Sequence, residues 1–475
     1  MKQELWKYSA IEMFNLFKRK VSTPLEVAQS IIDRKRLIDN KINAFVCFDE
    51  EKILSQAKLS TYRWEKNRIK GPLDGIPISI KDLIITKDFP THRGSSINSL
   101  PTNTKLDAPV VSKIKKNGGI ILGKTTTPEF GHKGTTQSIK YGETANPWNI
   151  NTNAGGSSGG SCAAVASGMG PLSVGTDGGG SIRIPASFCG LFGHKPTFGK
   201  IPAYPISPFG TVANVGPISK TVSDSALLMN VIAKPDSNDW HSLPLEKIDY
   251  LKYDTHHIKK FKVGFIPTWG MDKYINNLVI ETEVRKKINQ SINFLKKDGL
   301  NIKKINNFSW PNNPVKIFKT LWYLGAANLA KKINKKELKK IDKNFLNFIN
   351  LGKKYNAFDL MEAEEKRAEN AIYLSYIFDK YDVLIGPTLP ISAFSVERNI
   401  PRGWNQKDLF CWTPFTYPFN LTKNPASNLN CNFTDNNMPV GLQIVTPIFK
   451  DKRCFSFSFY LEKVFSLTCK WPNEL

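Results

Sequence analysis

Residues 153–161 read N-A-G-G-S-S-G-G-S, and residues 175–186 read G-T-D-G-G-G-S-I-R-I-P-A. Glycine adopts backbone conformations closed to other residues and lets main chain approach a bound group closely. Between the two glycine–serine turns lies a helix-sized segment of small residues, 162–167. A flexible linker would be polar throughout and would lack Val174, Ile182 and Ile184. The pattern therefore predicts a tightly packed turn system that presents serines and backbone N–H groups.

The second turn contains a candidate nucleophile, Ser181. Residues 172–176 read as a buried strand that ends in Asp177 and three glycines. Consecutive N–H groups from Gly178, Gly179, Gly180 and Ser181 could point at one spot beside the serine hydroxyl. Such donors stabilise the oxyanion of a tetrahedral acyl intermediate. A serine at its ordinary pKa also needs a base within about 2.6–3.2 Å.

A histidine is a poor candidate for that base. Residues 155–159 satisfy G-x-S-x-G, the nucleophile elbow of α/β-hydrolases, which needs a strand directly before it and an acid and a histidine after it. The preceding residues 146–153 are turn-formers. The downstream histidines lack an obvious catalytic context; they are His194, His241, His256 and His257.

Lys81 is the remaining candidate base. It lies in a predicted strand, 76–83, whose isoleucines share one face while Ser79 and Lys81 share the other. Taken alone, the strand favours an edge position from which the lysine reaches water. The other possibility is a buried amine, which burial would deprotonate and so make basic.

Residues 118–125, G-G-I-I-L-G-K-T, formally match the phosphate-binding P-loop pattern. The interior of the match is a β-branched run, whereas a phosphate cradle needs a flexible loop between strand and helix. We therefore reject nucleotide binding here.

Together with the two turns, further segments of the chain resemble the amidase signature family. They are D-G-I-P-I-S-I-K-D (74–82), G-K-T-T-T-P-E-F (123–130), G-H-K-P-T-F-G (193–199), V-G-P-I-S-K-T-V-S-D (215–224), Y-D-V-L-I-G-P-T (381–388), P-F-T-Y-P-F-N-L-T (414–422) and M-P-V-G-L-Q-I-V (438–445). The resemblance covers most of the chain and is weakest across roughly 235–380. It implies an α/β fold, a large mixed sheet covered on both faces by helices.

The resemblance also implies a Ser–cis-Ser–Lys triad. Ser181 falls at the acyl-accepting nucleophile, Ser157 at the bridging serine, which follows a cis peptide bond, and Lys81 at the base. The oxyanion donors are those named above. We expect Asp177 and Arg183 to pair and hold the loop.

Other contacts with substrate are less constrained by the pattern. Candidates are Phe130, Gly155, Gly156 and Arg367, the last where the glutaminase subunit of the family binds the glutamine carboxylate. Trp322, Tyr323 and Trp412 could line an apolar pocket, although aromatic residues more often form core.

We expect one amidase domain over 1–475, in four segments. Residues 1–60 form N-terminal helices with S/T-x-x-E capping boxes at Ser9 and Thr23. Residues 61–230 form the signature core, 235–380 a variable helical cap, and 381–475 return to the core sheet. Further strands are expected at 261–266, 301–305, 382–385 and 440–445, and a helix at 282–297.

Composition limits the classes of partner. Seven scattered cysteines and no C-x-x-C pair argue against disulfides and a zinc site and fit a cytoplasmic protein. No stretch is long and apolar enough to span a membrane. The net charge of +25 is mostly lysine and fits a solvated surface, with attraction of an anionic substrate or RNA as the alternative. We expect no cofactor, metal or nucleic acid, and a homodimer is possible.

These features predict a stand-alone amide hydrolase that forms an acyl-enzyme on Ser181. A glutaminase subunit of an aminoacyl-tRNA amidotransferase is the first alternative, although Thr413 stands near where that subunit carries an acidic residue. A non-catalytic RNA- or partner-binding protein is the second.

Overall fold

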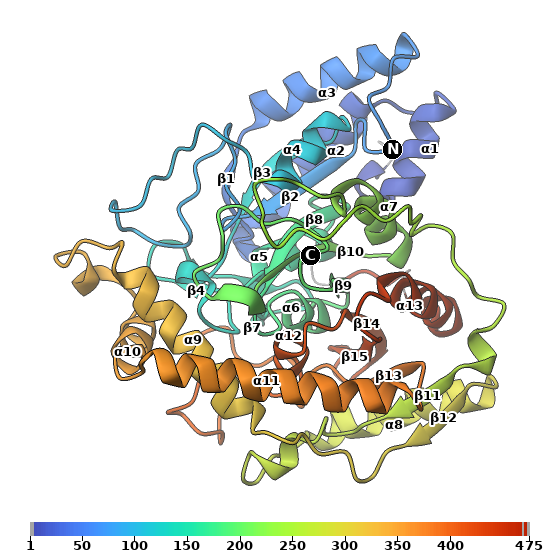
Figure 1. The fold of residues 1–475 in the computed structure, drawn as a ribbon. Coiled ribbons are helices and arrows are strands. Elements are labelled where there is room, and N and C mark those ends of the chain that lie inside the picture. Colours follow the sequence, from blue (N-terminus) through green and yellow to red (C-terminus); the bar gives the residue numbers. More distant parts are fainter. Residues whose placement is uncertain (1–3, 468–469, 473–475) are drawn as a thin grey trace.

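The computed structural model describes residues 4–467 and 470–472, which are arranged around an eleven-stranded mixed β-sheet (Figure 1). Its strand order is β1-β3-β2-β8-β10-β9-β14-β15-β13-β11-β12. The strands are β1 (Phe45–Phe48), β2 (Pro77–Lys81), β3 (Ile120–Thr125), β8 (Leu172–Asp177), β9 (Phe192–Lys195), β10 (Asn214–Ser219), β11 (Lys262–Phe265), β12 (Asn301–Lys304), β13 (Val383–Pro387), β14 (Ala426–Phe433) and β15 (Pro439–Val445).

Strand direction changes across the sheet. β2 runs parallel to both of its neighbours, β3 and β8. From β8 through β10, β9, β14 and β15 to β13, every neighbouring pair is antiparallel, and β13, β11 and β12 are again parallel. The predicted mixed sheet is confirmed.

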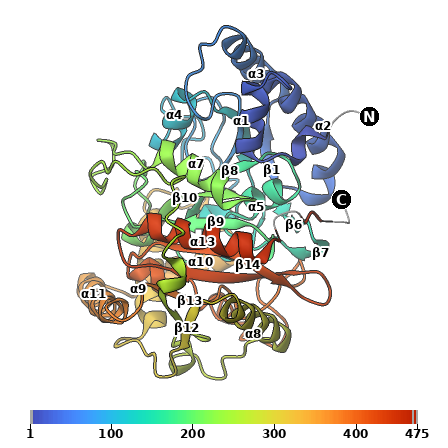
Figure 2. The same cartoon turned by 90° about the vertical axis from the view of Figure 1, so that its right-hand side faces the viewer.

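Helices cover both faces of this sheet. The longer ones are α1 (Ala10–Lys18), α2 (Pro24–Ile42), α3 (Glu50–Glu65), α4 (Pro109–Lys116), α5 (Gly159–Ala166), α6 (Arg183–Phe188), α7 (Val222–Ile232), α8 (Thr282–Lys297), α9 (Pro314–Ala330), α10 (Lys343–Gly352), α11 (Ala357–Phe378) and α13 (Asp451–Phe465). α5 and α6 contact each other and the central strands, while α7 and α13 contact each other and lie together across the sheet in Figure 2.

Local sequence explains several helix starts. Both predicted capping boxes form: the side chains of Ser9 and Thr23 accept from the N–H groups three residues on, and the glutamates there reach back. The region predicted to be helical, 315–380, contains α9, α10 and α11, and α9 packs on both of the others.

The predicted position of Lys81 at a sheet edge is wrong. β2 is the third strand in the sheet order and is hydrogen-bonded on both sides, so its side chains cannot reach water past an open edge. The residues expected to be turn-formers before Ser157 also include a strand, β7 (Asn149–Asn153). It pairs with β6 (Ala145–Asn146) in a separate two-stranded sheet, so no main-sheet strand runs into this turn.

The rejection of a P-loop is consistent with the structure. The pattern's interior is strand β3, and the Lys124 side chain is buried, where its Nζ donates to the Ile84 carbonyl and the Thr91 hydroxyl. None of the helices in the described residues is long and apolar enough to cross a bilayer. The cysteines that the structure describes are all free thiols.

Candidate active site

Lys81 ends strand β2, and its side chain has no exposed surface. Its Nζ lies 2.7 Å from Ser157 Oγ, 2.9 Å from Ser158 Oγ and 2.8 Å from Thr176 Oγ1. An ammonium has three hydrogens to donate and no lone pair, whereas a neutral amine donates two and can accept one. Three close hydroxyls, each able to donate or accept, therefore suit either protonation state.

Burial decides between those states. Removal from water lowers the pKa of Lys81 well below its ordinary value of 10.5, and the negative charge of Asp177 opposes this only in part. No salt bridge to Lys81 is formed within the described part of the chain. The geometry therefore favours a neutral amine in contact with a serine.

Ser157 lies between Lys81 and open space. The peptide bond from Gly156 to Ser157 is cis, as the resemblance implied. Ser157 borders the same cavity as Ser181, and the backbone N–H of Ser158 donates to the Ser181 carbonyl at 3.1 Å. No hydrogen bond joins the two hydroxyls of Ser157 and Ser181 in residues 4–467. Catalytic hydrogen bonds are often long without substrate and tighten when it binds.

The glycines before Ser181 have two roles. Ideal Cβ atoms at Gly178 and Gly179 would lie 2.9 Å from the Trp322 ring and 2.6 Å from the Phe318 ring, so only glycine lets α9 approach this loop. The N–H groups of Gly178, Gly179 and Ser181 donate to no other described residue and remain available to a ligand.

Gly180 departs from the predicted set of four oxyanion donors. Its N–H donates to Asp177 Oδ1 at 2.7 Å, and its φ of +126° is one that glycine tolerates. That N–H closes the loop on its own aspartate and is not free to bind an oxyanion.

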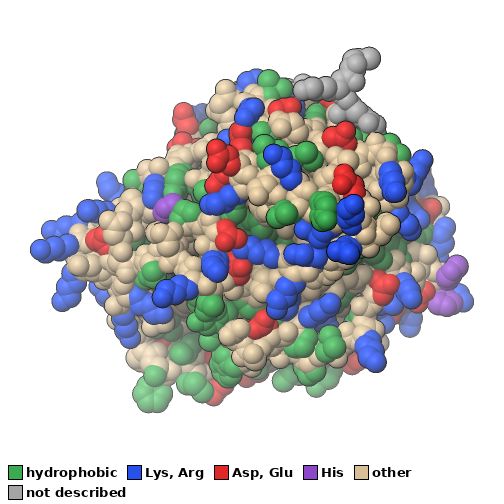
Figure 3. All heavy atoms as spheres, turned by 90° about the horizontal axis from the view of Figure 1, so that it is seen from above, with side chains coloured by type: hydrophobic (Ala, Val, Ile, Leu, Met, Phe, Trp, Pro, Cys, Tyr) green, Lys and Arg blue, Asp and Glu red, His purple; other side chains and the backbone are tan. Residues whose placement is uncertain are grey.

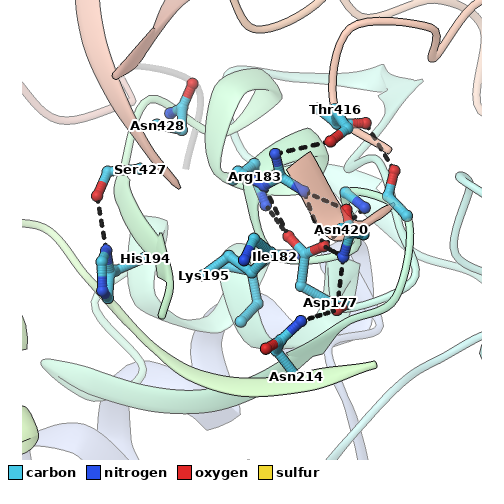
Figure 4. A network of polar contacts seen from close by, with 12 residues as sticks. Asp177, Ile182, Arg183, His194, Lys195, Asn214, Thr416, Asn420, Ser427 and Asn428 are labelled. Carbon is cyan, nitrogen blue, oxygen red and sulfur yellow. Dashed lines mark hydrogen bonds and ion pairs between the residues drawn. The ribbon is translucent and has the colours of Figure 1, made fainter. Parts of the chain in front are cut away.

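Asp177 and Arg183 hold the loop from behind, as predicted (Figure 4). Both are fully buried and are joined by two hydrogen bonds of 3.0 Å. Arg183 also donates to Asn420, Gln443 and the Thr416 carbonyl. Burial by itself would raise the pKa of Asp177, but the charge and hydrogen bonds of Arg183 hold this pKa well below its usual range.

His194 also belongs to a buried network (Figure 4). Its ring nitrogens lie 2.8 Å from Ser427 Oγ and 3.3 Å from Asp451 Oδ1. None of these three side chains lines the cavity beside Ser181, so this serine–histidine–aspartate arrangement connects β9, β14 and α13.

A cavity of about 430 Å³ opens beside Ser157 and Ser181. Its walls are mainly apolar, and Phe130, which was predicted to contact substrate, is among the lining residues. Trp322 lines it too, stacked on Phe209 with ring centroids 4.0 Å apart. Tyr323 and Trp412 do not line it; Trp412 is completely buried against Phe188.

The remaining substrate candidates lie elsewhere. Arg367 is buried and donates to the carbonyls of Asn420 and Leu421 and to Thr211 Oγ1, so its guanidinium anchors α11 to the segment around Asn420 and does not line the cavity. The proposed role of Arg367 in binding substrate is therefore wrong for this structure. Gly155 and Gly156 also lie outside the lining; a Cβ at Gly155 would come within 2.8 Å of Pro185.

Two residues that contact Lys81 were not predicted, Ser158 and Thr176. Because β2 pairs in parallel with β8 and Ile80 lies opposite Val174, the end of β8 comes beside Lys81. That register could have identified Thr176, but no sequence pattern fixes it.

A buried lysine, two serines at one cavity and free N–H groups beside one of them define a serine-based amide hydrolase site. The sequence model of the family described as Amidase matches residues 26–455, and the chain belongs to this family, the amidase signature enzymes. Members are hydrolases of carbon–nitrogen bonds.

Individual relatives extend over nearly all of the chain. An acylamidase from Rhodococcus erythropolis is 32% identical and is matched over 93% of this chain and 92% of its own. A glutamyl-tRNA(Gln) amidotransferase subunit from Halothermothrix orenii is 33% identical over 99% and 100%. A crystal structure of a bacterial aryl acylamidase of the amidase signature family superposes with a TM-score of 0.89 at 25% identity, over 98% and 99%.

The network behind the loop yields a prediction about stability. We expect Arg183→Met to lower the free energy of unfolding by about 3–5 kcal/mol, because Asp177 would remain buried without its counter-ion. Urea unfolding followed by circular dichroism measures this change.

Arg36→Met is the matched control, since Arg36 pairs with Glu50 at the exposed surface, where ion pairs contribute little. Equal losses for the two variants would contradict the role assigned to Arg183.

Proposed function

We propose that this chain is a stand-alone amidase that forms an acyl-enzyme on Ser181 and releases a carboxylic acid and an amine or ammonia. The observation that carries the proposal is the 2.7 Å contact between the buried Lys81 amine and Ser157, at the cavity that also holds Ser181.

The first step is proton transfer. Neutral Lys81 accepts the proton of Ser157, which accepts the proton of Ser181 as the Ser181 oxygen attacks the amide carbon. Ser158 and Thr176 hold the lysine nitrogen in place. The oxygen of the tetrahedral intermediate lies near the N–H groups of Gly178, Gly179 and Ser181, which stabilise its charge.

The second half returns the protons. The relay protonates the departing nitrogen, the carbon–nitrogen bond breaks, and the acyl group stays on Ser181 as an ester. Water then gives a proton to the same relay and attacks the ester, which releases the acid and restores the Ser181 hydroxyl.

The glutaminase alternative has less support from the cavity. Free glutamine carries an ammonium group, which needs an acidic partner when buried. Among the described lining residues the charged ones are Arg93 and Lys332, and none is acidic. Arg367, the candidate for holding a glutamine carboxylate, is engaged by main chain.

We expect Ser181→Ala to lower kcat/KM for a neutral anilide such as 4-nitroacetanilide on the order of 10⁴-fold or more, because no acyl-enzyme can form. Release of 4-nitroaniline measures turnover, and circular dichroism checks the fold. In the parent protein, assayed without other subunits, the anilide should be cleaved faster than glutamine.

Ser55→Ala is the control, since Ser55 is exposed on α3 away from the cavity, and it should retain full activity. An active Ser181→Ala protein would refute the mechanism. A protein that cleaves glutamine only, and only with added subunits, would support the amidotransferase alternative.

The buried lysine also predicts a pH dependence. Lys81 works as a base only when neutral, and burial lowers its pKa, so kcat/KM should rise as pH passes this pKa and then level off. The midpoint of the rise should lie well below 10.5.

Initial rates with a neutral substrate across a pH series give this profile. Thr176→Val removes one of the hydroxyls on Lys81 Nζ and should shift the midpoint while retaining the rise. A midpoint at 10.5 or above, or a rate that falls over the same interval, would contradict a neutral Lys81.

A further inference from the structure

The charges around the cavity are all of one sign. Its described lining contains Arg93 and Lys332 and no aspartate or glutamate, while the other walls are mostly apolar. The molecule carries a net charge of +25, and basic side chains are spread across the face seen in Figure 3. Such a field raises the local concentration of anions and disfavours cations.

Arg93 is held in place by main chain. Its N–H donates to the carbonyl of Asp82, the residue after Lys81, and its own carbonyl accepts from the Phe130 N–H. The side-chain Nη1 donates to the carbonyls of Thr91 and Pro101 at 3.1 and 3.0 Å. These contacts fix the half-buried guanidinium relative to the catalytic strand.

The guanidinium lacks an acidic partner. No carboxylate of the described chain lies within ion-pair distance of it, and its Nε and Nη2 make no hydrogen bond there. The nearest acid that acts on it is Asp82, whose carboxylate accepts from the N–H groups of His92 and Gly94 and lies 3.8 Å from Lys124. Removal from water lowers the pKa of Arg93, as expected for a cation without a counter-ion. A planar guanidinium with free donors is well suited to bind a carboxylate.

Lys332 adds a second positive charge to the lining. It follows α9, where its N–H donates to the Leu329 carbonyl, and its side chain is exposed. Leu329 and Trp322 of the same helix form apolar wall. A substrate that extends from Ser181 therefore meets apolar surface and these two cations.

We propose that the preferred substrates are amides that carry a carboxylate, joined to the reacting amide through an apolar chain or ring. The carboxylate binds Arg93 and Lys332 while the carbonyl lies at Ser181. This inference rests on the proposed amidase activity and adds the chemical class of its substrate.

Three 4-nitroanilides of equal chain length test it: those of hexanoic acid, of adipic acid with one carboxylate free, and of 6-aminohexanoic acid. They differ only in a terminal methyl, carboxylate or ammonium. An apolar cavity without an anion subsite would favour the methyl, because a charge is costly to remove from water. We expect kcat/KM at low ionic strength to follow carboxylate, methyl, ammonium, with at least about a tenfold advantage for carboxylate over methyl.

A second pair places the carboxylate on the amine side: 4-acetamidobenzoate against 4-methylacetanilide. A preference for the carboxylate in either pair supports the proposal, and the pair in which it occurs assigns the subsite to the acyl or the amine side.

Variants then locate the preference. Arg93→Gln and Lys332→Gln should each reduce the ratio of carboxylate to methyl substrate several-fold, and Arg93→Lys should retain more of it than Arg93→Gln. Arg68→Gln changes the net charge equally at an exposed position outside the cavity lining and should leave the ratio unchanged. If Arg93→Gln fails to fold, exposed Lys332 still provides the test.

Preference for the methyl substrate in both pairs would overturn the inference. So would a ratio that neither Arg93→Gln nor Lys332→Gln alters. Either result leaves the proposed function intact as long as Ser181→Ala abolishes cleavage of the hexanoyl anilide. An active Ser181→Ala protein would instead refute the proposed function itself.

Discussion

A primary amine excluded from water and surrounded by hydroxyls is the constraint on which this site depends. Lys81 could not be tolerated there as an unpaired ammonium without a large desolvation cost, and the described residues supply no adjacent carboxylate to offset it. Ser157, Ser158 and Thr176 instead surround a nitrogen that can be neutral at moderate pH. Burial in the centre of the sheet thus makes a lysine into a base, a role that histidine takes in other serine hydrolases.

The rest of the core maintains that position. β2 is clamped between two parallel strands, which fixes where Lys81 ends, and the loop after β8 brings Ser181 to the same cavity. Behind the loop, Asp177 and Arg183 carry the other buried charges, and they neutralise each other. The site therefore combines one paired ion system that holds the backbone with one unpaired amine that is available for chemistry.

Much of this arrangement could be predicted from the sequence. The glycine–serine turns, the triad residues and the Asp177–Arg183 pair each depend on local composition or on family motifs. The edge position favoured for Lys81 was wrong, because strand order is set by packing between distant segments. The strands 45–48, 192–195, 214–219 and 426–433 were missed, since their sequences carry little apolar alternation.

Other features depend on contacts that no local pattern encodes. Gly180 was assigned as an oxyanion donor, but its N–H faces Asp177, and the direction of one N–H within a glycine run cannot be deduced from composition. Arg367 was placed at the substrate by family position, whereas the fold uses it to anchor α11. Arg93 drew no attention because only the assembled cavity reveals a cation without a counter-ion.

The protonation state of Lys81 can be measured directly by titrating its ¹³Cε resonance by NMR in selectively labelled protein, with Lys81→Met to assign the signal. The account predicts that this resonance titrates well below 10.5, so that the amine is neutral where the enzyme is fully active. A Lys81 that stays protonated up to pH 10.5 would contradict it.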